Sequence, residues 1–223
     1  MKFSIESSEV NKLLSVVSKT VDTSSVLPIL ESVLVKINKA NNEIVFCTTN
    51  LESSIKAKTK EVRIEEEGNF VIPVKLFNSY LSSGVDSKLN FELDNNKLII
   101  KSSKSKTEFQ THNPDDFPKI NLEKGNVLKV SKKDLINGIK LTRFCASNDS
   151  SQQVFNSVLL NLNLEELDIV ATDAHRLSEF KVKTNGESPK ELSEQKILIP
   201  SRAIDVMSFV VSRAEVQGDE IDL

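Results

Sequence analysis

The chain has 223 residues, a mass of 24.9 kDa and a formal net charge of −3, with 39% hydrophobic and 27% charged residues. This composition is typical of a globular, water-soluble protein and excludes a disordered chain, which would have fewer apolar residues or a larger charge imbalance. The longest unbroken apolar run is Ile44–Cys47, far short of the about 20 residues in a membrane-spanning helix. We expect no membrane association, and no secretory signal because no apolar stretch follows Lys2 and Glu6.

Cysteine, histidine and glycine usage restricts the chemistry further. Two cysteines, Cys47 and Cys145, and two histidines are too few for a disulfide framework and make a metal site improbable, so we expect reduced thiols. The six glycines are never close neighbours, which excludes a Gly-rich dinucleotide turn and a phosphate-binding loop. We therefore expect no cofactor.

The first predicted unit opens with a short strand at Phe3–Ile5 and continues with a helix from about Ser7. Apolar residues recur at helical spacing on one face of this helix, at Val10, Leu13, Leu14, Val17 and Val21. Alternating apolar residues then predict three strands, around Val33–Ile37, Ile44–Cys47 and Ile55–Lys60.

The same order of elements follows in the next segment. A strand at Phe70–Ile72 precedes a short helix over roughly Lys75–Ser82, and Gly84 stands where a helix stop is expected. Three more strands are predicted, around Leu89–Leu93, Leu98–Ile100 and Thr107–Thr111. A strand, a helix and three strands, used twice, predict an α+β domain over residues 1–121, with a polar boundary that ends at Asn126.

An internal repeat predicts a second domain of the same kind over residues 127–223. Ile44–Thr59 is similar to Ile169–Thr184 at a constant spacing of 125 residues, and Phe70–Pro73 matches Ile197–Pro200 with a two-residue shift. After Pro200 only 23 residues remain, and Val216–Leu223 would match the strand at Leu89–Leu93. We expect the second domain to lack its last two strands and to be truncated.

The densest polar cluster, Thr172–Leu177, follows the apolar strand Ile169–Ala171. Asp173 and His175 could form an acid–base pair, which leaves a hydrolase as one hypothesis. The alternative is that Asp173 accepts hydrogen bonds from nearby backbone amides and Arg176 is a solvated charge. No nucleophile motif accompanies the cluster, so the sequence favours the second interpretation.

Basic residues are the second candidate for function. Lys132, Lys133, Lys140 and Arg143 fall within one arc of a predicted helix, a face that could hold nucleic acid through its phosphates alone. Lysine outnumbers arginine 24 to 5 and tryptophan is absent, which disfavours bidentate base recognition and base stacking. Ordinary solvated lysines are an alternative that the sequence supports equally.

Several motifs resemble, in order along the chain, the family of the bacterial DNA polymerase III beta subunit, the sliding clamp. These motifs are Met1-Lys2-Phe3-Ser4, Val26–Leu30, Asp116-Phe117-Pro118, Thr172–Ser178 and Ile199-Pro200. The resemblance implies three duplicated domains per subunit, the third absent here, and a head-to-tail homodimeric ring with helices lining its hole. It implies a non-catalytic, cytoplasmic, nucleoid-associated protein that encircles double-stranded DNA without sequence preference and tethers the polymerase.

The resemblance also implies roles for individual residues. One wall of a pocket for short peptides of the polymerase III alpha subunit and the clamp loader is expected at Phe155, Thr172, His175, Arg176 and Leu177. Helix residues facing DNA would be Lys75, Lys132, Lys133, Lys140, Arg143 and Arg202, and the dimer edge would include Thr107 and Phe109. Ala174 stands where the family usually has glycine. Without a third domain the ring is not expected to close, so the alternative is a ring-incompetent peptide-binding adaptor.

Overall fold

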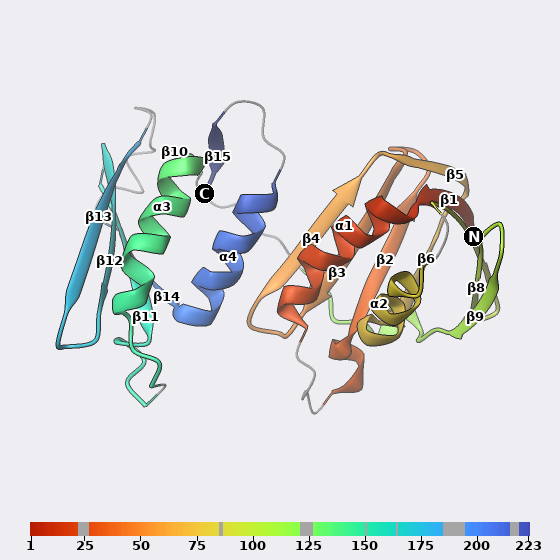
Figure 1. Cartoon of the computed structure of the whole chain (residues 1–223), viewed down its shortest axis with the longest axis horizontal. Helices are drawn as coiled ribbons and strands as arrows, with labels where there is room; N and C mark the ends of the chain where they lie inside the picture. The colour runs from red at the N-terminus through yellow and green to blue at the C-terminus, as the bar shows by residue number, and fades with distance from the viewer. Residues whose placement is uncertain are drawn as a thin grey trace. The chain divides into compact units, whose positions relative to one another are not determined.

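The structure is a computed structural model that describes residues 1–21, 27–84, 87–120, 127–149, 151–163, 165–184, 195–214 and 219–223. Three regions singled out in the sequence, Val26, the boundary stretch 121–126 and Val216, lie outside the described residues. The chain divides into unit 1, Met1–Asn121, and unit 2, Leu122–Leu223, and each combines short helices with antiparallel strands (Figure 1). The predicted α+β class is confirmed. No described helix is long and apolar enough to cross a membrane.

Unit 1 contains two antiparallel sheets and two helices. One sheet has the strand order β5-β1-β7-β8-β9 and the other has the order β4-β3-β2-β6. Helices α1 (Ser7–Val17) and α2 (Val74–Ser82) lie side by side and pack on the four-stranded sheet (Figure 1). The strands are β1 (Lys2–Glu6), β2 (Ser32–Asn38), β3 (Glu43–Thr49), β4 (Ser54–Thr59), β5 (Val62–Glu66), β6 (Gly68–Pro73), β7 (Lys88–Asp94), β8 (Lys97–Lys101) and β9 (Lys106–Gln110).

Aromatic side chains join the layers of unit 1 into one core. Phe77 on α2 is fully buried, and its ring centroid lies 6.4 Å from that of Phe46 on β3 and 6.3 Å from that of Phe91 on β7. Phe91 in turn stacks on Phe3 of β1 at a centroid distance of 4.6 Å. Because one helix residue meets both sheets, the apolar faces of the two sheets are buried together.

The two halves of unit 1 exchange their first strands. β1 belongs to the first half but pairs with β7 of the second half, with Phe3 opposite Phe91. β6 opens the second half and pairs with β2 of the first half, with Val33 opposite Ile72. Strand β5, which pairs with β1, is an addition to the predicted order, although Val62 alternates with charged neighbours and could have indicated it.

Unit 2 repeats this order of elements. Helices α3 (Lys132–Thr142) and α4 (Ser201–Arg213) pack against each other beside a sheet of order β13-β12-β11-β14. β10 pairs with β15 as β1 pairs with β7, so β15 is the predicted counterpart of the strand at Leu89–Leu93. The strands are β10 (Lys129–Ser131), β11 (Ser157–Leu162), β12 (Glu166–Thr172), β13 (Leu177–Lys183), β14 (Gln195–Pro200) and β15 (Glu220–Asp222).

The strand pairings correct the alignment of the repeat. The β3–β4 hairpin closes with Thr49 opposite Ser54, and the β12–β13 hairpin closes with Thr172 opposite Leu177. These hairpins are 123 residues apart, so the predicted spacing of 125 was wrong there by two residues. Strand side chains alternate with a period of two, and a two-residue shift therefore leaves every apolar residue on its face and is not visible in the sequence.

Candidate functional site

The turn between β12 and β13 is fixed by its own side chains. Oδ1 of Asp173 accepts hydrogen bonds from the backbone N–H groups of His175 and Arg176, at 3.0 and 2.9 Å. The Thr172 hydroxyl donates to the carbonyl of Arg176 at 2.7 Å and accepts from the N–H of Ala174 at 3.2 Å. Ala174 has a φ of 71°, a left-handed conformation that glycine adopts more readily. The hydrogen bonds on both sides of Ala174 hold it in this conformation.

Asp173 is held in its ionised form. The backbone N–H of Arg176, and after it that of His175, lowers the pKa of the Asp173 carboxyl below its ordinary value. Oδ2 accepts a hydrogen bond from Nε of Arg176 at 3.0 Å, so both carboxylate oxygens are occupied within the turn. A carboxylate in this state shapes the backbone and is a poor general acid. The predicted hydrogen bonds from local backbone amides to Asp173 are confirmed.

Arg176 connects this turn to the end of α3. Its Nη2 donates to the carbonyl of Phe144 at 2.8 Å, and its guanidinium carbon lies 5.5 Å from the centroid of the Phe144 ring. Beside it, the Ser178 hydroxyl donates to the carbonyl of Leu141 at 2.7 Å. The interpretation of Arg176 as only a solvated charge was therefore wrong, although its side chain remains largely exposed.

Large apolar side chains are exposed around this junction. Leu141 is 51% exposed, Phe144 57%, and both Val154 and Leu177 64%. Exposed apolar groups that gather around a rigid turn are typical of protein-binding surfaces.

Leu141 and Phe144 were missed as candidates for function. Ile139 lies on the buried face of α3, and Leu141, two residues later, therefore falls on the opposite side of the helix. An apolar residue away from the buried face of this helix was the signal that could have identified Leu141. Phe144 belongs to a short 3-10 turn that follows the helix, Arg143–Cys145, and no periodic pattern marks it.

The predicted pocket residues lie on neighbouring segments of unit 2. Thr172, His175, Arg176 and Leu177 belong to the turn or its two ends. Phe155 lies in the loop before β11, where its carbonyl accepts the N–H of Ser147 at 2.7 Å, just beyond the 3-10 turn. We call the following residues the turn surface: Leu141, Phe144, Phe155, His175, Arg176 and Leu177.

Two of the cations predicted to face DNA also contact α4 or the residue that follows it. Nζ of Lys132 donates to the carbonyl of Ala214, next to the end of α4, at 2.8 Å. Arg143 donates two hydrogen bonds to Asp205 of α4, both at 3.1 Å. α3 ends at Thr142, so the prediction that Arg143 lies on this helix was wrong.

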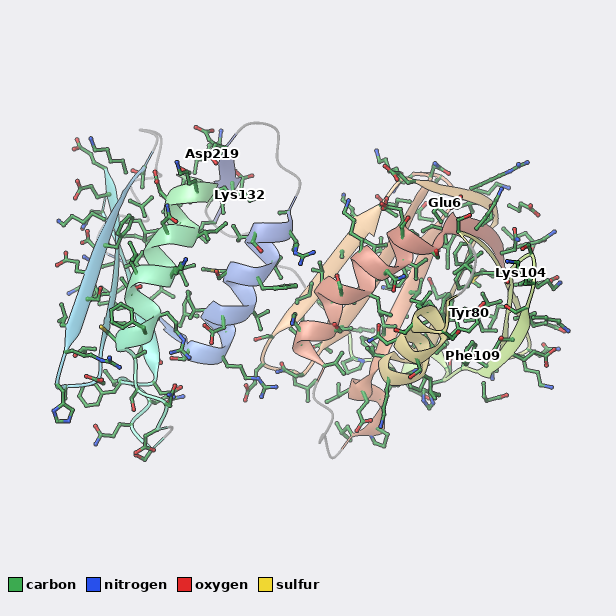
Figure 2. All side chains as sticks on the ribbon, in the orientation of Figure 1. Glu6, Tyr80, Lys104, Phe109, Lys132 and Asp219 are labelled. Atoms are coloured by element: carbon green, nitrogen blue, oxygen red, sulfur yellow. The ribbon has the colours of Figure 1, made fainter. Side chains whose placement is uncertain are left out.

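A backbone hydrogen bond also fixes the start of α3, because the N–H of Lys132 donates to the carbonyl of Asp219. Figure 2 shows these two residues side by side. The other four predicted cations have exposed side chains. They are Lys75 on α2, Lys133 and Lys140 on α3, and Arg202 on α4.

Thr107 and Phe109 lie on β9, the edge strand of the five-stranded sheet. The ring of Phe109 packs edge-on against Tyr80 of α2 with 5.5 Å between centroids (Figure 2). In the part of the chain that the structure describes, β9 pairs only with β8, so its other side presents backbone groups to which a partner strand could bind.

Thiol and metal chemistry find little support in the described ranges. Cys47 and Cys145 are both buried and free. No cluster of three or more His, Cys, Asp or Glu side chains suitable for a metal ion occurs among the described residues.

Both units match one protein family. Residues 1–122 match the DNA polymerase III beta subunit, N-terminal domain, and residues 129–219 match the DNA polymerase III beta subunit, central domain. The chain belongs to the DNA polymerase III beta subunit family.

Relatives named "Beta sliding clamp" are similar over most of this chain. That of Synechococcus elongatus is 27% identical over 206 residues, which cover 92% of this chain and 54% of the relative. That of Mycoplasma genitalium is 27% identical over 207 residues, which cover 89% of this chain and 54% of the relative. The chain thus spans about half the length of the curated relatives it matches.

Solved structures share the fold at lower sequence identity. The DNA polymerase sliding clamp from Bacillus subtilis has a TM-score of 0.88 at 22% identity, and the match covers 100% of this chain and 59% of that one. The DNA polymerase III beta subunit from Thermotoga maritima has a TM-score of 0.84 at 23% identity, and the match covers 99% of this chain and 58% of that one.

Proposed function

We propose that these two units form part of a DNA sliding clamp, a non-catalytic ring that encircles duplex DNA and tethers the replicative polymerase. The observation that carries the proposal is the match of the N-terminal and central family domains, in that order, over residues 1–122 and 129–219. Such a protein acts on DNA in the cell interior, and we place it in the bacterial cytoplasm with the nucleoid. In the proposed head-to-tail ring, β9 with Thr107 and Phe109 supplies one edge of the dimer contact.

The turn surface is the proposed binding site for partner peptides of the polymerase alpha subunit and the clamp loader. Leu177 and Phe144 offer apolar contact area, and Arg176 is fixed by Asp173 and by the Phe144 carbonyl. Because the polar groups already have partners, the surface is organised before a peptide arrives and little ordering entropy is lost on binding. An apolar anchor on a short peptide is the ligand that such a surface fits.

The proposed contact with DNA is weak and independent of sequence. Lys75, Lys133, Lys140 and Arg202 are exposed on helices, whereas Lys132 and Arg143 also hold α4 in place. A few cations on an acidic protein with a net charge of −3 attract phosphates without holding them tightly. Long residence on DNA would then come from the closed ring and not from affinity.

Peptide binding is tested with a matched pair of leucines. Leu177 and Leu51 are 64% and 63% exposed, and each lies at a hairpin turn of the same geometry, one in each unit. We expect Leu177→Ser to weaken binding of a polymerase alpha-subunit peptide about tenfold, measured by fluorescence anisotropy, and Leu51→Ser to leave it unchanged. Equal losses in the two variants, or no binding by the parent protein, would contradict the proposed site.

Ring closure is tested by retention on DNA. After loading onto a nicked circular plasmid by the clamp loader, a clamp stays bound through a high-salt wash and dissociates when the plasmid is linearised. A protein that binds the peptide yet washes off the circular and linear forms equally is the adaptor, and this result would overturn the ring proposal. Lys133→Glu with Lys140→Glu is expected to reduce loading, because two cations that attract phosphates are reversed.

A further inference from the structure

The outer face of the four-stranded sheet in unit 1 carries a small core of its own. Leu34 of β2, Cys47 of β3 and Val71 of β6 are buried there under Phe117. The segment His112–Ile120, which we call the cover segment, is attached at both ends. The N–H of His112 donates to the carbonyl of Val71 at 2.9 Å, and Nζ of Lys56 donates to the carbonyl of Ile120 at 3.3 Å.

A cavity of about 210 Å³ opens between the cover segment and the sheet. Leu34, Cys47 and Phe117 supply apolar walls, and three lysines line the same cavity: Lys36, Lys56 and Lys119. Asp115 is the one acidic residue among the described residues that line it. The lining therefore combines a few apolar side chains with a clear excess of positive charge.

The lysines at this cavity are not neutralised by ion pairs with the described residues. Lys36 and Lys119 form no ion pair with any described residue, and Lys56 contacts a backbone carbonyl and no carboxylate. Lys36 and Lys56 also act on the Cys47 thiol, whose pKa is raised by burial and lowered in part by these two cations. The thiol thus stays protonated and serves as part of the apolar wall.

A comparison with unit 2 shows that the positive charge at this cavity is specific to unit 1. By strand register, the counterparts of Lys36 and Lys56 are Asn161 and Glu179. On the same face of unit 2, Lys181 lies within 4.0 Å of carboxylate oxygens from Glu166, Asp168 and Glu179. The basic cavity is therefore not a general consequence of the duplicated fold.

We propose that this cavity binds an acidic peptide segment, in which one small apolar side chain enters between the sheet and the cover segment and flanking carboxylates meet Lys36 and Lys119. Apolar side chains with a cationic border match that ligand better than a nucleic acid, whose bases offer no aliphatic group larger than the methyl of thymine. The site lies in unit 1 and does not depend on the turn surface or on the proposed clamp function.

The test is a titration followed by the backbone amide signals of the whole protein in NMR. The probe is the blocked pentapeptide Asp-Asp-Leu-Asp-Asp, compared with a form that has Ser for Leu and a form that has Asn for every Asp. We expect the first peptide to shift the signals of Lys36, Cys47 and Phe117, and each comparison peptide to bind at least about fivefold more weakly.

Charge reversal provides the matched variants. Lys36→Glu and Lys119→Glu are each expected to weaken the peptide about tenfold, whereas Lys88→Glu, an exposed lysine on β7 of the other sheet, leaves binding unchanged. Near-ultraviolet circular dichroism of Tyr80, the one tyrosine of the chain, verifies that unit 1 remains folded. Absent shifts, equal affinity in Lys36→Glu, or a short DNA duplex that shifts the same signals at lower concentration would each overturn the proposal.

Discussion

The hairpin turns of the two units share one geometry and differ in the side chains that they present. In unit 1, Oδ1 of Asn50 accepts the N–H groups of Glu52 and Ser53 at 3.1 and 2.7 Å, as Asp173 does in the turn of unit 2. The second turn residue is left-handed in both units, with a φ of 73° at Leu51 and 71° at Ala174.

The shared geometry shows that the turn itself is a property of the duplicated fold. What distinguishes unit 2 is the sequence His175-Arg176-Leu177, where unit 1 has Glu52-Ser53-Ser54. An Asx-type turn is therefore a scaffold, and the proposed function depends on three exposed side chains that it supports.

The two units also differ in how completely their apolar residues are covered. Phe70 and Val71 on β6 are buried, at 1% and 0% exposure, whereas their counterparts Ile197 and Leu198 on β14 are 42% and 44% exposed. Burial is the main source of stability, so the described part of unit 2 is expected to be the less stable unit.

The largest expected effect is that of Phe77→Ala in unit 1. Phe77 is fully buried and contacts aromatic rings of both sheets, so its loss should lower the free energy of unfolding by about 3–5 kcal/mol. Ile204→Ala, at the matching position of α4, should cost about 2–3 kcal/mol, because a smaller side chain leaves a smaller cavity. Urea unfolding followed by Tyr80 fluorescence measures the loss in unit 1, and the backbone amide NMR signals of unit 2 measure the loss for Ile204→Ala. An equal or larger loss for Ile204→Ala would contradict the comparison.

The next largest difference between the units is expected in the rate of amide hydrogen exchange. β7 lies in the middle of a five-stranded sheet, whereas its counterpart β15 pairs only with β10 among the described residues. A two-stranded pair is only marginally stable, so the amide of Ile221 should exchange at least about 100-fold faster than that of Leu89. Mass spectrometry of exchanged peptides measures this, and equal protection would show that the sheets are equally stable.

Gly138 marks a third difference, in how the first helix of each unit packs. A Cβ atom at Gly138 would lie 2.6 Å from Cδ1 of Ile169 and 2.9 Å from a ring carbon of Phe180, whereas unit 1 has Leu13 at this position of the helix. By strand register, Phe180 corresponds to Ala57. Large and small residues have thus changed places between the helix and the sheet.

We expect Gly138→Leu to destabilise unit 2 by about 1–3 kcal/mol, because the helix would be forced away from the strands. The double variant Gly138→Leu with Phe180→Ala recreates the arrangement of unit 1 and should recover part of the loss. Thermal unfolding of the single and double variants measures the coupling energy between positions 138 and 180. Strictly additive losses would show that the two positions contribute to stability independently.

The smallest expected effect comes from Asp173→Asn, which gives unit 2 the turn residue of unit 1. The amide oxygen can accept the same two N–H groups, whereas the amide nitrogen cannot accept from Nε of Arg176, so only that hydrogen bond is lost. Because the fold lowers the pKa of Asp173, its stabilising effect is present above the ordinary value of about 3.9 and is lost as the pH falls through the lowered value. Amide shifts of His175 should titrate in that acidic window in the parent protein and not in the variant; a titrating variant would assign the change to another group.

The sequence predicted the order of elements well because the helices and strands have clear periodicities. The buried face of α1 is the predicted face, at Val10, Leu13, Leu14 and Val17. The α+β class and the family were also predicted, the family from motifs such as Thr172–Ser178. β15 lies within the predicted range Val216–Leu223, but by strand register Ile221 corresponds to Leu89 and lies five residues further from Pro200 than the repeat predicts.

Other features depend on tertiary contacts that no pattern in the sequence encodes. The two-residue error in the hairpin alignment arose because the strand period conceals it. The sequence alone identifies Arg143 as a surface cation. Its hydrogen bonds could not be predicted, because their acceptor, Asp205, lies 62 residues further along the chain. The basic cavity was missed because Lys36, Lys56 and Lys119 come from three separate segments that only the folded sheet brings together.

The exchange of first strands has a consequence for synthesis. Phe3 pairs opposite Phe91 as well as Ile64 of β5, and Val130 pairs opposite Ile221, so each unit begins with a strand that has one partner translated almost a whole unit later. At bacterial elongation rates the apolar strand β1 would wait roughly 4–18 seconds for β7 to be made. During that interval the nascent chain presents an unpaired edge, and the ribosome surface or a chaperone is its nearest available neighbour.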